Sequence, residues 1–185
     1  MARSNRKPSK GKKINPKFWV FCEGETEKAY VRLLRSIYRL PIEIKSAGDD
    51  INEGYIRKYK WGKPTHKKDQ DFLIYDADVE VILNRLKKIR GVKLLASNPS
   101  IELWFLLHYK NHSSHITTEN CIRELSNRKR NVYKKGTLDE KLIDKLISKR
   151  QEAVRRAKRT SLYENPSTNI YEFIEILEQV NSEKL

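Results

Sequence analysis

Cysteine and long apolar runs are what this sequence has least of. Only Cys22 and Cys121 occur among its 185 residues, which excludes a disulfide framework and a cysteine-based zinc site. No apolar run approaches the roughly 18 residues that a membrane-spanning helix needs. The basic N-terminus lacks the apolar segment of a secretory signal peptide. We therefore expect a cytoplasmic protein that makes no membrane contact.

Acidic residues are scarce relative to basic ones. Asp and Glu number 24 against 39 Lys and Arg, which gives a net charge of +15. Such an excess favours a polyanionic partner, most often nucleic acid. The first 17 residues hold seven basic side chains, no acid and no apolar pattern. We expect residues 1–17 to form a disordered basic tail, whose charge has a second explanation as a solubilising arm.

From Phe18 onward, short apolar runs alternate with segments of helical spacing. Continuous apolar runs are typical of strands that are covered on both faces, and the alternation predicts a parallel sheet with helices on its faces. The expected order is strand, helix, strand, loop, strand, helix and strand over residues 18–22, 25–37, 42–44, 47–68, 72–75, 79–89 and 92–96, and the loop has room for one short helix. We therefore expect an α/β core over residues 18–98.

Beyond Pro99 the sequence predicts helices and no further strand. Apolar residues recur at helical spacing in four segments, which are 101–109, 117–128, 138–150 and 170–180. We expect residues 99–185 to form a helical C-terminal part that packs on the α/β core.

Acidic residues follow two of the predicted parallel strands. Glu23 comes directly after the first strand, and Asp76 and Asp78 come at the end of the third. Ligands of open parallel sheets bind beyond the carboxyl ends of the strands. Carboxylates gathered there repel one another, and their hard oxygens suit Mg²⁺ or Mn²⁺. The alternative interpretation is that Asp76 and Asp78 are turn or N-cap residues.

These residues resemble the two signatures of a Toprim domain, Cys22-Glu23-Gly24 and Asp76-x-Asp78. Three further stretches resemble motifs of the RloB-like family, in the family's order, and the resemblance runs from about Phe18 to Leu177. The stretches are Ser-Asn-Pro-Ser-Ile-Glu-Leu-Trp-Phe-Leu-Leu-His at 97–108, Tyr-Lys-Lys at 133–135 and Asn-Pro-Ser-Thr-Asn-Ile-Tyr at 165–171. Residues 49–68 are short and divergent.

The resemblance implies a Toprim-like, Rossmann-like fold and a metal-dependent nuclease of an abortive-infection type of phage defence. It implies Mg²⁺ or Mn²⁺ as cofactor, RNA (tRNA among the candidates) or DNA as substrate, and an ATPase companion. A homo-oligomer is compatible with this pattern. Two alternatives stay open. One is a non-catalytic nucleic-acid-binding or effector subunit, and the other is a phosphotransfer enzyme with Asp76 as nucleophile.

The resemblance also implies roles for individual acids. The metal ligands would be Glu23, Asp76, Asp78 and Glu102. Glu27 lies one helical turn after Glu23 and would be a second ligand or a base, or else an acid that favours the helix dipole. Glu102 opens an apolar helix, where it would be either a further ligand or a dipole partner.

Two basic residues of the motifs have open roles. His108 follows Glu102 by six residues, which is about 120° around a helix, so the two need not meet. It would be a general acid, a phosphate contact or a structural histidine. Lys135 would stabilise a developing phosphorane charge, or it is a surface lysine like Lys134 beside it.

Basic residues also gather in two stretches that favour nucleic-acid binding. Residues 123–159 hold 14 basic and 5 acidic side chains, and residues 57–68 interleave lysines with aromatic rings. Rings beside positive charge favour single-stranded or looped nucleic acid, because bases stack on them. The alternative is a solvated surface. The candidate contacts are Arg57, Lys58, Lys60, Arg155, Arg156, Lys158 and Arg159.

Overall fold

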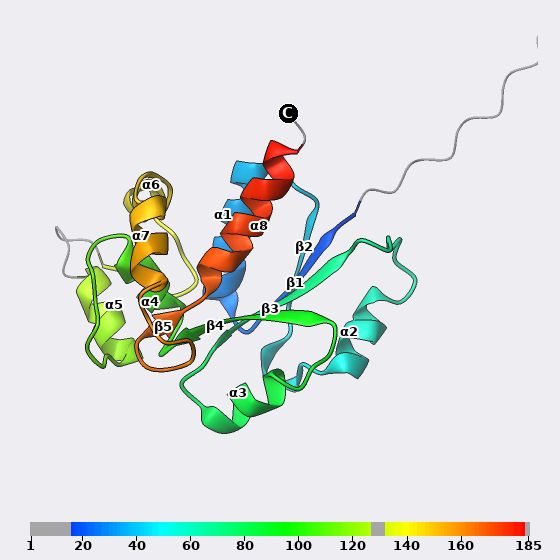
Figure 1. Cartoon of the computed structure of the whole chain (residues 1–185), viewed down its shortest axis with the longest axis horizontal. Coiled ribbons are helices and arrows are strands. Elements are labelled where there is room, and N and C mark those ends of the chain that lie inside the picture. Colours follow the sequence, from blue (N-terminus) through cyan, green and yellow to red (C-terminus); the bar gives the residue numbers. More distant parts are fainter. Residues whose placement is uncertain (1–15, 127–131, 184–185) are drawn as a thin grey trace, which may run out of the picture.

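A computed structural model describes residues 16–126 and 132–183 and arranges them around one five-stranded sheet (Figure 1). The strands are β1 (Phe18–Cys22), β2 (Ile42–Ser46), β3 (Gln70–Asp76), β4 (Val92–Asn98) and β5 (Ser167–Thr168). Their order is β2-β1-β3-β4-β5, with the first four parallel and β5 antiparallel to β4. The predicted α/β fold with a mostly parallel sheet is confirmed.

Eight α-helices flank this sheet within the described ranges. They are α1 (Glu25–Tyr38), α2 (Glu53–Lys60), α3 (Glu80–Leu86), α4 (Ile101–Leu107), α5 (Thr118–Ser126), α6 (Glu140–Ser148), α7 (Arg150–Ala157) and α8 (Ile170–Ser182). A short 3-10 turn, η1, spans Gly48–Asp50. None of the helices in the described ranges is both long and apolar enough to cross a bilayer.

Side chains of β1 alternate between two apolar cores because a strand has a period of two. Val20 and Cys22 belong to the core that also contains side chains of α1, α4 and α8. Trp19 and Phe21 belong to the opposite core, which is covered by α2 and α3. Figure 1 shows α1 and α8 over one face of the sheet and α2 and α3 over the other. The strand is therefore buried on both faces, which explains its uninterrupted apolar sequence.

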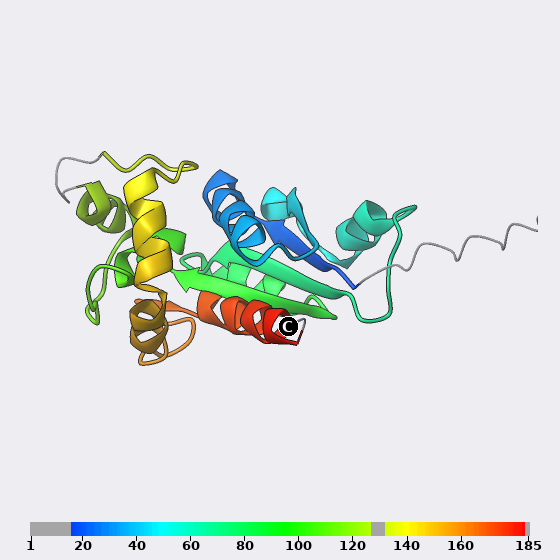
Figure 2. The same cartoon turned by 90° about the horizontal axis from the view of Figure 1, so that it is seen from above.

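The helices from α4 to α7 gather beyond one end of the sheet. Figures 1 and 2 agree on this placement, and the tip of the β4 arrow points toward the group. Buried side chains of these helices, such as Trp104, Leu125 and Leu146, belong to the same apolar core as β1 and α1. The helices therefore stand over the carboxyl ends of the parallel strands, where ligands of such sheets bind.

The expectation of no strand after residue 99 is wrong. Ser167 and Thr168 form β5, which pairs with Asn98 and Ser97 of β4. Asn169 continues this pairing through its side chain, since its Oδ1 accepts from the Ala96 N–H at 2.7 Å and its Nδ2 donates to the Leu94 carbonyl at 3.0 Å. A two-residue strand carries no apolar run or alternation, so the sequence offered no signal for it.

The helical boundaries also differ from the expected ones. The segment expected as one helix over 138–150 ends at Ser148 as α6, and a separate helix, α7, follows. The sequence gives no clear apolar pattern for α7. Its buried side chains, Ala153, Val154 and Ala157, are small and lie among basic residues. The helix expected over 117–128 spans 118–126 as α5, and residues 127–131 lie outside the described ranges.

The predicted basic tail lies almost wholly outside the described residues, since the description begins at residue 16. Lys17, which was assigned to the tail, is part of the fold. Its backbone N–H donates to Asp69 Oδ1 at 2.8 Å, and the Trp19 indole Nε1 donates to Asp69 Oδ2 at 2.9 Å. Asp69 therefore fixes the start of β1 against the loop that precedes β3.

Candidate functional site

The parallel strands bring acidic side chains together at one end of the sheet. Glu23 follows β1, and Asp76 is the last residue of the neighbouring β3. The Glu23 Oε2 accepts from the Asp76 backbone N–H at 2.8 Å. They line a cleft of about 240 Å³, which we call the acidic cleft, and its lining residues are Glu23, Gly24, Glu25, Thr26, Glu27, Asp76, Lys135 and Gly136.

Glu27 turns back from the first turn of α1 into this cleft. Its Oε2 accepts from the Gly24 N–H at 2.9 Å, so the carboxylate satisfies a backbone donor that the helix start leaves open. A Cβ at Gly24 would stand 3.1 Å from the same oxygen, which explains why glycine suits this turn. Burial, and after it the charges of Glu23 and Glu102, raises the pKa of Glu27 to about 6.

Asp76 is the acid with the largest pKa shift in the cleft. Its Oδ1 accepts from the Ile101 N–H at 3.0 Å, at the start of α4. Burial, followed by the charges of Glu27, Glu23 and Glu102, raises the pKa of Asp76 to about 9. Burial also raises the pKa of Glu23, and the charges of Asp49 and Asp78 add to that shift. The site therefore concentrates negative charge that these carboxyl groups relieve by holding protons.

Glu102 is buried at the base of the same group, with a side chain that is 1% exposed. Its Oε1 accepts from the Tyr133 hydroxyl at 2.9 Å, and its Oε2 accepts from the Ser100 hydroxyl at 2.7 Å. The ammonium of Lys135 lies 4.0 Å from Oε2. Glu102 is thus held by two neutral donors and one cation, all supplied by the motifs at 97–108 and 133–135.

Asp78 and His108 lie apart from this group. Asp78 is exposed on the turn after β3, and only its charge reaches Glu23. His108 is buried at the end of α4, where its Nδ1 lies 2.9 Å from the Trp104 carbonyl oxygen. It lines a second, larger cavity, as the 120° offset from Glu102 anticipates. The structure thus brings together Glu23, Glu27, Asp76, Glu102 and Lys135.

The residues expected to contact nucleic acid divide into two sets. Lys60, Arg156 and Lys158 are engaged within the fold. Lys60 pairs with Asp71 at 2.7 Å, Arg156 donates to the Leu107 carbonyl at 2.6 Å, and Lys158 pairs with Glu175 at 2.5 Å. The remaining four expected contacts are exposed, and they are Arg57, Lys58, Arg155 and Arg159.

Three further residues of the site were not predicted from the sequence. Thr26 Oγ1 accepts from the Gly136 N–H at 2.9 Å and so ties the 133–136 segment to α1. Ser100 supports Glu102, and Asp49 lies near enough to Glu23 to raise its pKa. Asp49 follows β2 by three residues, so its place at the carboxyl end of a parallel strand was the available signal.

The residue types at the acidic cleft fit a hard divalent cation, because carboxylate oxygens are its preferred ligands. Each of Glu23, Glu27 and Asp76 directs one carboxylate oxygen to a backbone N–H. Within residues 16–126 and 132–183, no group of three or more His, Cys, Asp or Glu side chains is arranged to hold a metal ion. Binding would therefore require these side chains to reorient.

A comparison with protein families agrees with the motifs. A family model described as RloB-like protein matches residues 18–177. Among solved structures, the chain is similar to the C-terminal region of the Burkholderia pseudomallei OLD protein, at 14% identity and a TM-score of 0.38, covering 91% of this chain and 100% of that chain. No curated protein matches the sequence. The matched residues 18–177 include the whole of the acidic cleft.

Proposed function

This chain belongs to the RloB-like family, and from that premise we propose that it is a nuclease that uses Mg²⁺ or Mn²⁺ to cleave RNA or DNA. The observation that carries the proposal is the accumulation of carboxylates at the end of the sheet. Burial and three neighbouring carboxylates raise the pKa of Asp76 to about 9. An ion pair with a cation would lower the pKa of an acid. The raised pKa therefore indicates that the site has too few positive charges to balance its carboxylates.

Under this proposal Glu23 and Asp76 would hold the divalent ion, with Glu102 as a further ligand. Asp78 would join them only by turning toward the cleft from the turn after β3. A bound ion would neutralise negative charge on the attacking and leaving oxygens of a phosphodiester. Glu102 accepts one hydroxyl hydrogen bond on each oxygen, which leaves a further lone pair on each that would bind the ion.

The remaining cleft residues suit the movement of protons and the binding of phosphate. Glu27 faces the cleft with a pKa near 6, so at neutral pH its carboxylate is mostly ionised and is able to accept a proton from water. Lys135 lines the same cleft, and its side chain is 53% exposed. Its ammonium is therefore available to a phosphate oxygen and would stabilise the charge that develops there.

The substrate would approach over the exposed basic residues of α2 and α7. The family resemblance further supports a role in phage defence under the control of an ATPase companion. It leaves the choice between tRNA, other RNA and DNA to experiment.

The test is cleavage of labelled tRNA, single-stranded RNA and plasmid DNA with Mg²⁺, Mn²⁺ or EDTA. Asp76→Asn should abolish cleavage while nucleic-acid affinity in EDTA stays within about twofold, because the variant changes no basic contact. Glu140→Gln, which removes an exposed acid of α6, is the matched control and should cleave normally.

Cleavage that persists in EDTA or in Asp76→Asn would contradict the proposal. If neither the isolated chain nor the chain with its ATPase companion cleaves any substrate, while binding persists, the chain is a binding subunit.

A further inference from the structure

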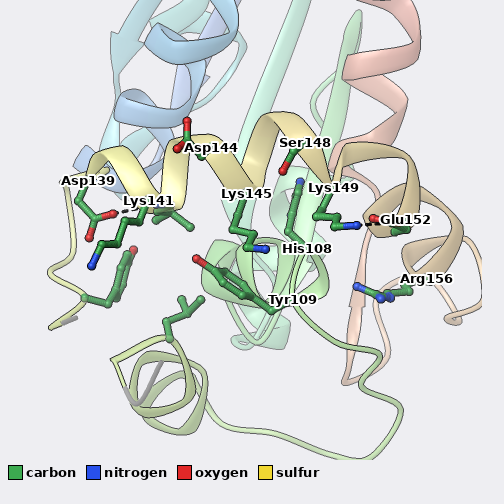
Figure 3. Close-up of a pocket in the computed structure, with 13 residues that line it drawn as sticks. His108, Tyr109, Asp139, Lys141, Asp144, Lys145, Ser148, Lys149, Glu152 and Arg156 are labelled. Carbon is green, nitrogen blue, oxygen red and sulfur yellow. Dashed lines mark hydrogen bonds and ion pairs between the residues drawn. The ribbon is translucent and has the colours of Figure 1, made fainter. Parts of the chain in front are cut away.

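A cavity of about 1000 Å³ lies among α4, α5, α6 and α7, and Figure 3 shows its lining side chains. Its size matches the upper end of small-ligand pockets, which span roughly 300–1,000 Å³. Tyr133 connects this cavity with Glu102, since it lines the cavity and its hydroxyl donates to Glu102 at 2.9 Å. Glu102 in turn lies 4.0 Å from the ammonium of Lys135, which lines the acidic cleft. A molecule bound in the cavity would therefore touch a residue that supports the acidic site.

His108 lines this cavity and carries an unused hydrogen-bond acceptor, Nε2, which neighbouring side chains cover. Its Nδ1 lies 2.9 Å from the Trp104 carbonyl oxygen, and since a carbonyl only accepts, Nδ1 carries the proton. Burial lowers the pKa of His108 to about 4, so the ring is neutral at pH 7 and Nε2 is a bare acceptor. Nε2 is buried and has no hydrogen-bond partner among the described residues. A complementary ligand would carry an N–H or O–H donor.

The cavity wall also combines aromatic rings with positive charge. Figure 3 shows Lys145 extending from α6 toward Tyr109, while Asp144 points to the other side of the helix. The Lys145 ammonium lies 5.9 Å from the centre of the Tyr109 ring. Rings and a lysine together suit a ligand with a flat aromatic part and an anionic part.

Of the three acids that line the cavity in the described part of the chain, Asp139 and Glu152 have partners within the fold, and Asp144 points away from Lys145 (Figure 3). Asp139 accepts from the Leu142 N–H at 2.8 Å as the N-cap of α6. Glu152 pairs with Lys149 at 3.3 Å. Lys149 therefore offsets the charge of Glu152, and the Asp139 carboxylate is held at the start of α6.

We propose that this cavity binds one unpaired nucleotide, with its base beside Tyr109 and Tyr133 and its phosphate near Lys145. A base N–H would donate to His108 Nε2 once the side chains that cover this atom shift. The choice of a nucleotide rests on the proposed function, whereas the cavity and its acceptor do not. The nucleotide would come either from a strand bound at the acidic cleft or from the free nucleotide pool. In the first case the cavity selects an unpaired position next to the cleaved bond.

The experiment is calorimetric titration of the full chain in EDTA, where no metal-dependent cleavage interferes. The ligands are the four ribonucleoside 5′-monophosphates and an eight-nucleotide single-stranded RNA of mixed sequence. His108→Phe keeps a ring of similar size and removes the acceptor, and Lys145→Met keeps the side-chain length and removes the charge. His115→Gln and Lys88→Met are the matched controls, because both residues are exposed and neither lines the cavity.

Each cavity variant should weaken binding about 5- to 20-fold, as expected for one lost hydrogen bond or charge contact, and the controls should bind like the wild type. Binding of the RNA alone assigns the site to a strand, and binding of a monophosphate shows that a free nucleotide suffices. No binding, or binding that neither variant changes, would overturn the inference. If His108→Phe fails to fold, two other measurements test the inference. Lys145→Met should weaken binding, and the ¹⁵N chemical shift of His108 Nε2 in the wild type should change as the ligand is added. If the wild-type chain binds a nucleotide in the cavity but cleaves no nucleic acid, only the proposed nuclease function is refuted.

Discussion

The protonation of a single residue, Asp76, makes the stability of the folded protein depend on pH. Its pKa is raised by burial and by three carboxylates, so the folded protein holds this proton to higher pH than the unfolded chain does. The folded state therefore loses stability as the pH rises from about 4, the usual pKa of an aspartate, to about 9.

Asp76→Asn should stabilise the metal-free protein. The amide oxygen keeps the acceptor for the Ile101 N–H. The amide is neutral at every pH, so the variant folds without the proton that Asp76 must take up. At pH 8 we expect a gain of at least about 1 kcal/mol, or roughly 2–4 °C in Tm for a chain of this size. Thermal unfolding in EDTA between pH 5 and 9 measures it, and the wild type should show the steeper decline. An equal or lower Tm for the variant at pH 8 would contradict this account.

Tyr133→Phe isolates the hydroxyl that supports Glu102. The ring keeps its edge contact with Phe105, whose centre lies 6.4 Å away, while a buried carboxylate loses a donor. We expect a loss of about 1–3 kcal/mol in the free energy of unfolding, measured by urea denaturation. Tyr163→Phe is the control, because the Tyr163 hydroxyl makes no hydrogen bond to the described residues. A loss as large in the control would show that the effect does not come from the hydrogen bond to Glu102.

At the scale of the elements, the parallel strands were predictable and their contacts with the C-terminal part were not. Residues 18–22 and 72–75 are buried on both faces, so their apolar runs stand out in the sequence. Glu23 and Asp76 meet because β1 and β3 are neighbouring parallel strands that end together. The contact of Glu102 with Tyr133 joins residues 31 positions apart through tertiary packing, and no local pattern encodes it.

Asn169 links α8 to the sheet and offers a test at this scale. Its side chain makes two hydrogen bonds to the backbone of β4, and the residue is 3% exposed. Asn169→Ala would leave the Ala96 N–H and the Leu94 carbonyl without these partners. The free energy of unfolding should fall by about 2–4 kcal/mol, measured by urea denaturation. Asn84→Ala on the exposed side of α3 is the matched control and should change it by less than about 0.5 kcal/mol.

For the whole molecule, the excess of positive charge predicts how salt affects nucleic-acid binding. If about six basic side chains contact phosphates, the logarithm of affinity should fall with the logarithm of salt concentration at a slope near −4 on a single strand and near −5 on duplex DNA. Replacing the exposed Arg57, Lys58, Arg155 and Arg159 with alanine should reduce the single-strand slope by up to about 3.

Filter binding in EDTA across 50–400 mM salt would measure these slopes. Lys93→Ala is the control, because Lys93 pairs with Glu172 at 2.8 Å within the fold. An unchanged slope in the fourfold variant would move the contact surface away from α2 and α7.

The short pairing of β5 with β4 also bears on how the protein behaves among copies of itself. A strand at the margin of a sheet presents open N–H and C=O groups that another chain is able to pair with. Ser167, Thr168 and the side chain of Asn169 cover that margin of β4 over residues 94–98. Any change that detaches this segment would expose a ready template for self-association, so loss of the last helix should cause aggregation before it causes unfolding.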